Sequence, residues 1–301
     1  MKTNTEQDYK ERMLRVLVHI QNHLDEAVSL DDLASIANFS PFHFHRVFRG
    51  MLGEGVMEHC RRLRLERAAQ RLKQSEEQVT AIAFEAGYET LDAFIRAFRM
   101  RFGMPPTEFR KDCAAKIQSL PSGIGYHPQT VLQDFEPIRK GVLEMDVNVR
   151  NVPPMKVVFV RVNGPYTQSA GQAWGKLCSW AGRKGLMRSQ PVLIGISHDD
   201  PEITPPDKVR YDACLVVQQE VEPEGDFGVQ ELGGGDYAIT MHKGPYERLG
   251  ETYSYLCGQW APQNGYRLRS LPPFEIYKKD PSVAKPEDLL TEIYLPVEKV
   301  G

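Results

Sequence analysis

Aromatic, imidazole and guanidinium side chains gather in the stretch Ser40–Gly53, and their spacing sorts them onto the two sides of a helix. One side carries apolar residues at the i, i+3, i+4 and i+7 positions of a buried stripe: Phe44, Val47, Phe48 and Met51. The other side carries Phe42, His45, Arg46 and Arg49. Guanidinium groups bind phosphates and guanine edges, and an exposed ring can contact a thymine methyl group. The stretch therefore predicts a helix that contacts DNA, with ordinary solvated charges as the alternative for the two arginines.

The histidines and cysteines do not indicate metal chemistry. His43 and His45 have no further ligand at a suitable spacing, and the five cysteines are widely separated without a CxxC pair. We expect reduced cysteines and neither a metal ion nor a cofactor. The polar amino terminus, with no apolar run near the ~20 residues of a membrane span, predicts a cytoplasmic protein without a membrane partner. If the chain binds DNA, it is expected at the bacterial nucleoid.

The charge of the chain is the one property that does not favour DNA. The formal net charge is −3 over 301 residues, a length that suits two or three domains. Basic residues nevertheless outnumber acidic ones within 46–73 and within 96–111. Because affinity for phosphate depends on local clusters, these segments remain compatible with DNA binding.

The elements around the first stretch form a helix-turn-helix pattern. Residues 9–24 predict a packing helix, and Ser29 is the expected cap of the short helix that follows. A turn is expected at Asn38, before Ser40 caps the helix that starts at Pro41. These lengths are typical of DNA-binding helix-turn-helix motifs.

The pattern repeats about 50 residues later. The second copy contains Phe94, Arg96, Phe98, Arg99 and Gly103, which match Phe44, Arg46, Phe48, Arg49 and Gly53. Residues 56–74 predict one long helix between the copies, and this helix would fix their separation. If the separation is near one turn of DNA, roughly 34 Å, one chain could read two successive major grooves.

These two units resemble the DNA-binding domain of the AraC/XylS family. The resemblance lies in Leu33, Ala34, Ala37 and the run RVFR at 46–49, and in the runs IAFEAGY at 82–88 and FGMPPTEFR at 102–110. It implies a transcription regulator that binds double-stranded promoter DNA, with RNA polymerase as a further partner. The implied base-reading helices are 41–51 and 90–100.

The resemblance also indicates which side chains read bases. On the first helix they are Phe42, His45 and Arg46, which belong to the outer face derived above, and on the second they are Leu91, Asp92 and Arg96. Leu91 can neither donate nor accept a hydrogen bond, so most base discrimination is expected on the first helix. Asp92 can accept from cytosine N4, with a helix-surface or capping role as the alternative.

A second duplication follows a connector. Residues 113–143 lose the helical pattern and read as a linker. Beyond them, the turn GPY at 164–166 returns 80 residues later at 244–246, and TrpAla at 180–181 returns at 260–261. Each copy reads as β-α-β-β, which predicts one α+β domain with a pseudo-twofold axis. The fold is therefore multidomain: an all-α double helix-turn-helix domain (1–112), the linker (113–143) and an α+β domain (144–301).

The second half resembles the GyrI-like effector-binding domain, through the paired GPY turns, the TrpAla pairs and the closing run TEIYLPV at 291–297. The resemblance implies an apolar cleft between the two copies and a buried glutamate, at Glu292, for cationic drugs. The equivalent residue of the first copy is Asp212.

Residues that line a ligand cleft are expected at positions where the two copies differ. Four aromatic residues have no aromatic counterpart in the other copy and are the expected cleft walls: Trp174, Tyr255, Phe274 and Tyr277. Aromatic walls beside a desolvated carboxylate suit an organic cation, so the expected effector is small and cationic or aromatic. Ordinary core packing is the alternative for each ring, and a local salt bridge is the alternative for Glu292.

Two other functions remain open for the second half. It could be a small-molecule hydrolase that uses Glu292 and a tyrosine as general acid and base, or a protein-binding module of the gyrase-inhibitor kind. The sequence contains no nucleophile elbow, metal cluster or phosphate loop. We therefore expect a regulator that is not an enzyme.

Overall fold

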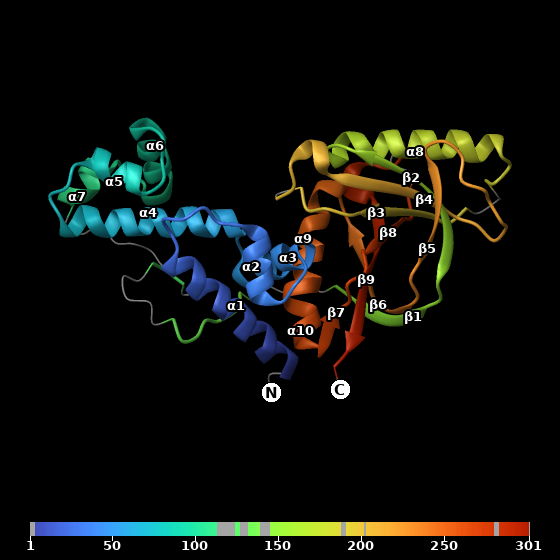
Figure 1. The fold of residues 1–301 in the computed structure, drawn as a ribbon, viewed down its shortest axis with the longest axis horizontal. Helices are drawn as coiled ribbons and strands as arrows, with labels where there is room; N and C mark the ends of the chain where they lie inside the picture. The colour runs from blue at the N-terminus through green and yellow to red at the C-terminus, as the bar shows by residue number, and fades with distance from the viewer. Residues whose placement is uncertain are drawn as a thin grey trace. The chain divides into compact units, whose positions relative to one another are not determined.

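The chain divides into two compact units. They are a helical unit, Gln7–Lys140, and a sheet unit, Gly141–Gly301, with which Met1–Glu6 is grouped; Figure 1 labels the elements of both. The computed structural model describes residues 4–112, 124–126, 132–138, 145–187, 191–201, 203–279 and 283–300. Most of the predicted linker lies outside these residues. Within them, no helix is both long and apolar enough to cross a membrane.

The helical unit contains two helix-turn-helix motifs, formed by α2 with α3 and by α5 with α6, on either side of the long helix α4. Its described helices are α1 (Asn4–Asn22), α2 (Leu30–Ala37), α3 (Pro41–Leu52), α4 (Val56–Gln74), α5 (Val79–Glu85), α6 (Leu91–Phe102) and α7 (Pro106–Lys111). The predicted double motif is thus confirmed.

Local sequence explains where these helices start and turn. Ser40 Oγ accepts a hydrogen bond from the His43 N–H, and Thr90 Oγ1 accepts one from the Ala93 N–H, each at 3.3 Å. Asn38 makes the turn of the first motif in the left-handed conformation, with φ of 53°. The repeated phenylalanines are fully buried in both motifs: Phe44, Phe48, Phe94 and Phe98.

The sheet unit is a nine-stranded antiparallel sheet in the order β1-β6-β9-β8-β3-β4-β2-β5, with β7 paired to β9. Its strands are β1 (Val147–Val152), β2 (Met155–Asn163), β3 (Leu193–Ser197), β4 (Arg210–Val216), β5 (Phe227–Leu232), β6 (Gly235–Lys243), β7 (Tyr266–Leu268), β8 (Phe274–Tyr277) and β9 (Leu290–Lys299). Its helices are α8 (Tyr166–Arg183), α9 (Leu249–Tyr255), the π-helical η3 (Leu256–Trp260), α10 (Ala261–Gln263) and the 3-10 turns η1 (Pro206–Lys208), η2 (Tyr246–Arg248) and η4 (Pro286–Asp288).

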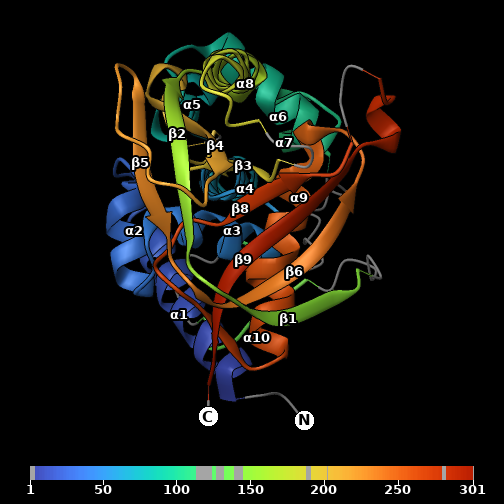
Figure 2. The same ribbon diagram turned by 90° about the vertical axis from the view of Figure 1, so that its right-hand side faces the viewer.

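The two copies exchange their first strands. Strand β1 pairs with β6 of the second copy, and β5 pairs with β2 of the first copy. Figure 2 shows β1 beyond β6 and β5 beyond β2. The α+β fold is as predicted, but each copy has an additional strand before the β-α-β-β unit. Sequence could not place these strands, because their partners are distant in the chain.

The two faces of this sheet pack in different apolar cores and carry different carboxylates. The helix face packs against α8 through Val160, Ala213 and Leu215. The far face carries a second core that includes Val157, Ile194 and Phe274. In the register of β3, β8 and β9, Gly195 lies opposite Glu275 and Ile276 opposite Glu292. Since successive strand residues alternate between faces, Glu275 lies on the helix face and Glu292 on the far face.

Candidate functional site

Helix α3 has the apolar stripe that the sequence predicted. Phe44, Val47 and Phe48 are fully buried and Met51 is 1% exposed. Arg46 lies over the ring of Phe42, with its guanidinium carbon 3.5 Å from the ring centre. This stacking holds the guanidinium plane of Arg46 in one orientation. His45 and Arg46 are only 3% and 6% exposed, so the outer face that the sequence predicted to be exposed is largely buried. The base-reading roles of Phe42, His45, Arg46 and Arg49 stay predictions.

Helix α6 presents the corresponding residues of the second motif. Asp92, Arg96 and Arg99 are exposed. Leu91 is half-buried and packs against the core around Phe94 and Phe98. That packing explains an apolar residue at a position where the resemblance implied base reading. The polar part of this face therefore consists of the aspartate and the two arginines.

Several arginines of the basic cluster on α4 are used inside the helical unit. Arg64 Nε donates to the Leu24 carbonyl at 2.7 Å, and Arg62 donates to Glu54 and Glu66. Arg67 pairs with Asp25, and Arg71 with Glu77. The count of basic residues in 46–73 therefore overstates the positive charge that α4 offers to a phosphate backbone.

In the sheet unit, a buried carboxylate lies on the helix face. Glu275 of β8 is 2% exposed. Its Oε2 accepts from the Tyr277 hydroxyl at 2.6 Å, and its Oε1 accepts from the Tyr253 hydroxyl at 3.0 Å and from Ser197 Oγ at 3.4 Å. These donors come from α9, β8 and β3, so the carboxylate lies near the pseudo-twofold axis between the copies.

A directional chain of hydrogen bonds leads to this carboxylate. Trp174 Nε1 of α8 donates to the Tyr211 hydroxyl at 3.0 Å, and that hydroxyl lies 2.8 Å from the hydroxyl of Tyr277. Because Tyr277 donates its proton to Glu275, Tyr211 must donate to Tyr277. Burial, followed by the charge of Glu275, raises the pKa of both tyrosines, so both hydroxyls stay protonated. Every donor in the chain is oriented toward the carboxylate.

The copies contribute different residues to this group, which we call the Glu275 cluster (Glu275, Tyr253, Tyr277, Tyr211, Trp174 and Ser197). Where the second copy has Tyr253 and Glu275, the first has Ala173 and Gly195. A side chain at Gly195 would collide with the hydroxyls of Tyr211 and Tyr277. The small residues of one copy therefore make room for the polar residues of the other.

The predicted grouping of Glu292 with Trp174 and Tyr277 is wrong, because the sheet separates them. Glu292 lies on the far face and pairs with Lys278 at 2.8 Å and Arg150 at 3.8 Å. Burial raises its pKa, but the hydrogen bonds from Lys278 and Tyr294 outweigh burial and lower it. This is the local salt bridge that the sequence left as the alternative.

The other predicted wall residues also divide between locations. Phe274 stacks on Tyr294 in the far-face core, with ring centres 4.5 Å apart. Tyr255 is half-buried at the end of α9. Trp174 and Tyr277 do meet, edge to face, with ring centres 5.8 Å apart. Of the predicted walls, these two belong to the Glu275 cluster.

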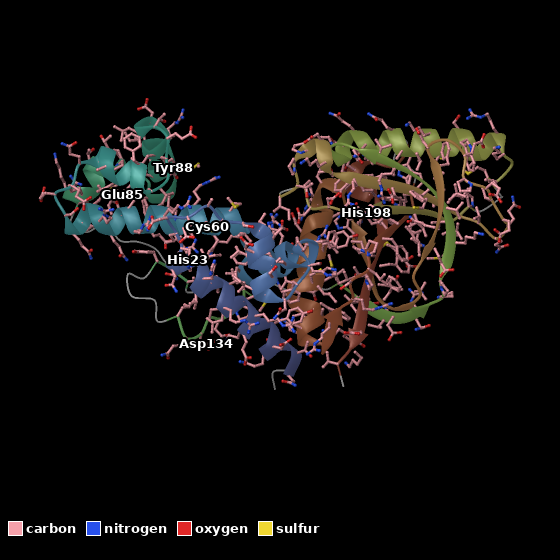
Figure 3. The ribbon with its side chains drawn as sticks, viewed as in Figure 1. His23, Cys60, Glu85, Tyr88, Asp134 and His198 are labelled. Atoms are coloured by element: carbon pink, nitrogen blue, oxygen red, sulfur yellow. The ribbon has the colours of Figure 1, made fainter. Side chains whose placement is uncertain are left out.

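The two far-face carboxylates occupy equivalent positions in the copies, but their basic partners are only partly equivalent, since Arg161 corresponds to Met241. Asp212, which is equivalent to Glu292, accepts from Arg161 Nε at 2.7 Å and lies 2.7 Å from His198 Nε2. His198, labelled in Figure 3, is equivalent to Lys278. Burial raises the pKa of Asp212, but Arg161 and His198 outweigh burial and lower it. The sequence did contain a signal for the other carboxylate, since Glu275 differs between the copies whereas the far-face carboxylate is repeated.

Comparisons with known proteins agree with both units. A family described as a GyrI-like small molecule binding domain matches residues 145–298, and one described as a helix-turn-helix domain matches residues 33–112. The Bacillus subtilis HTH-type transcriptional regulator YbfP is 33% identical over 102 residues, which cover 34% of this chain and 35% of YbfP. This chain thus spans about a third of the length of that relative.

Two further relatives extend over the sheet unit. The probable transcriptional regulator YgiV of Escherichia coli K12 is 28% identical over 161 residues, or 52% of this chain and 98% of YgiV. The transcriptional regulator Rob of Salmonella typhimurium is 28% identical over 236 residues, or 76% of this chain and 77% of Rob. This chain belongs to the GyrI-like small molecule binding domain family, and it carries an AraC-type helix-turn-helix domain on the amino-terminal side of that domain.

Proposed function

We propose that this chain is a sequence-specific DNA-binding transcription regulator, and that a small molecule held at the Glu275 cluster modulates its activity. The observation that carries the proposal is the combination of two AraC-type helix-turn-helix motifs with a GyrI-like domain in one chain. The exposed Asp92, Arg96 and Arg99 of α6 provide a polar face suited to DNA. RNA polymerase is a further partner implied by the AraC resemblance.

The Glu275 cluster favours an organic cation as the effector. A carboxylate that accepts several hydroxyl hydrogen bonds is stabilised as an anion in a buried place, where it attracts positive charge more strongly than it would in water. The rings of Trp174 and Tyr277 add faces and edges for an aromatic or quaternary ligand. Entry of such a ligand requires Trp174 or Tyr211 to move, because their hydrogen bond closes the group on one side.

DNA binding is tested by selecting bound duplexes from a random pool with the full chain, and then with Arg46→Ala and Arg96→Ala. If each arginine contacts a base, each variant loses about 1–3 kcal/mol of discrimination at its own base position. We expect the two affected positions to be separate and roughly one DNA turn apart. Failure of the wild type to enrich any sequence at low salt would overturn the proposal.

One observation supports the hydrolase alternative for the sheet unit. Tyr277 and Glu275 form a 2.6 Å hydrogen bond, which is the distance expected for an acid–base pair. The raised pKa of Tyr277 opposes its use as a base but allows it to act as a proton donor. Turnover of an added ester or epoxide that is lost in Glu275→Gln would favour this alternative, and binding without turnover favours the regulator.

A further inference from the structure

A single buried carboxylate connects three parts of the helical unit. Glu66, in the middle of α4, is 1% exposed. Its Oε1 accepts from Arg62 Nη1 at 2.9 Å and from Arg101 Nη2 at 3.1 Å. Its Oε2 accepts from the backbone N–H of Tyr126 at 3.0 Å. Arg101 lies on α6 and Tyr126 lies beyond α7, so Glu66 joins the second helix-turn-helix motif to the segment that follows it.

The same network extends to the end of α3. Arg62 donates from Nε to Glu54 Oε2 at 3.1 Å and from Nη2 to Glu54 Oε1 at 2.7 Å. Glu54 directly follows Gly53, which ends α3 in the left-handed conformation with φ of 78°. His59 Nδ1 lies 2.7 Å from Glu54 Oε1. Ion pairs and hydrogen bonds therefore run from the end of α3, through α4, to α6.

A described part of the predicted linker covers this network. Ile124 is 1% exposed, and its carbonyl accepts from Arg62 Nη1 at 3.0 Å. The carbonyls of Gly125 and Tyr126 accept from Gln21 and Gln70 at 3.1 and 3.3 Å. A second part is held by the ion pair between Lys10 and Asp134, of which Asp134 is labelled in Figure 3. The segment 124–126 therefore belongs structurally to the helical unit.

We propose that Glu66 is a positioning residue that fixes the spacing of the two DNA-reading helices, α3 and α6, and that segment 124–126 keeps it in place. The inference rests on the proposed DNA binding. A buried charge network contributes little net stability, because desolvation offsets much of the attraction, but its directional bonds tolerate few geometries. The described apolar core of the second motif contains residues of α4, α5, α6 and α7 but none of α2 or α3, so the network adds a direct link between the two motifs.

The protonation of the network supports this role. Burial raises the pKa of Glu54, but hydrogen bonds from His59 and Arg62 outweigh burial and lower it to about 2. Burial also lowers the pKa of His59, so that ring is neutral at pH 7. The Glu54 carboxylate of the link is therefore ionised at neutral pH.

The test measures tolerance to half-site spacing in the full chain. Duplexes carrying both selected half-sites are compared with duplexes that have one extra base pair between them, by fluorescence anisotropy at fixed salt. If the two motifs are held at a fixed spacing, the inserted base pair should weaken wild-type binding about tenfold, which is a typical size for the coupling between two sites. In Glu66→Gln the penalty should fall to about twofold, because α6 can move to meet the displaced half-site.

A second variant distinguishes loss of the link from misfolding of the Glu66→Gln protein. Arg101→Gln removes the α6 side of the link, and Arg101 is 23% exposed, so its loss leaves the buried pair of Glu66 and Arg62 intact. The same reduced penalty is expected, with unchanged affinity for a duplex carrying one half-site. Glu77→Gln is the matched control, because Glu77 pairs with Arg71 outside the network, and it should keep the tenfold penalty.

The outcomes separate this inference from the proposed function. Affinity that falls equally on both duplexes in Glu66→Gln and Arg101→Gln, with the spacing penalty unchanged, would show that the network only stabilises the fold and would overturn the inference. An unchanged penalty at unchanged affinity would also overturn it. A wild type that binds neither duplex would instead overturn the proposed DNA binding itself.

Discussion

On the far face of the sheet, Asp212 and Glu292 pair with basic side chains, whereas on the helix face Glu275 accepts hydrogen bonds from the hydroxyls of Tyr253 and Tyr277. A far-face carboxylate with a basic partner occurs in both copies of the duplicated unit, and the Glu275 cluster occurs once. A feature repeated by both copies is explained by the shared fold. A feature present in one copy requires a separate explanation, and binding is the explanation we propose.

The largest expected effect concerns the far-face carboxylate of the first copy. Asp212 has a fully buried side chain, and Asp212→Asn would leave Arg161 and His198 without their carboxylate. Because Arg161 is 38% exposed and stays in contact with water, we expect the sheet unit to lose about 2 kcal/mol of unfolding free energy. All three tryptophans lie in the sheet unit, so their fluorescence during urea unfolding follows this unit alone. Glu292→Gln, whose partners are more exposed, should cost below about 1 kcal/mol.

The stability contributed by Asp212 should depend on pH in a defined direction. The pKa of Asp212 is lower in the folded state than its ordinary value of 3.8, so its contribution to stability is complete above that value. The contribution is lost as the pH falls through the folded-state pKa. The stability difference between wild type and Asp212→Asn should therefore be constant at neutral pH and shrink below pH 3.8. A difference that does not change in acid would contradict the assignment of an ionised pair.

The second effect concerns ligand binding. Benzyltrimethylammonium and its neutral isostere neopentylbenzene differ only in charge, so their affinity ratio reports the carboxylate. If Glu275 is the site, Glu275→Gln should reduce the preference for the cation by about tenfold or more. Quenching of tryptophan fluorescence provides the measurement, because Trp174 is part of the cluster. Loss of the preference in Glu292→Gln, with Glu275→Gln unchanged, would move the site to the far face.

The third effect concerns the glycine that admits the cluster. Gly195→Ala would place a methyl group against the hydroxyls of Tyr211 and Tyr277 and force them apart, at a cost of about 1–3 kcal/mol in a packed interior. Gly175→Ala in α8 is the matched control, because an added methyl group there meets nothing. The control should be neutral or slightly stabilising. Equal thermal shifts in both variants would show that the cluster is loosely packed.

Much of the helical unit could be predicted because its signals are local. The caps at Ser29 and Ser40, the turn at Asn38 and the repeated phenylalanines each depend on a few neighbouring residues. The link from Glu54 through Arg62 to Arg101 could not be predicted in this way, because its members are far apart in sequence and their side chains resemble ordinary surface charges. Net charge and basic clusters gave no indication of which arginines are used internally.

The carboxylates show where sequence reasoning about the sheet unit ends. Glu275 and Glu292 lie on adjacent strands, and their faces depend on the register that sets Ile276 opposite Glu292. A shift of that register by one residue would exchange the faces, and no turn residue in the sequence specifies it. Comparison of the two copies in the sequence could nevertheless have distinguished the two carboxylates. It marks Glu275, whose counterpart in the first copy is Gly195, as unique and Glu292, whose counterpart is Asp212, as repeated.

The exchanged strands β1 and β5 make the two copies inseparable. Each copy depends on the other for the partner of its first strand, so neither half of the sheet unit can complete its hydrogen bonding alone. A polypeptide containing one copy would have to pair with a second molecule of itself to reproduce the same sheet. Such an assembly would be symmetric and would place identical residues on both sides of its axis. Fusion of the copies into one chain is therefore what permits Gly195 to face Glu275 across that axis.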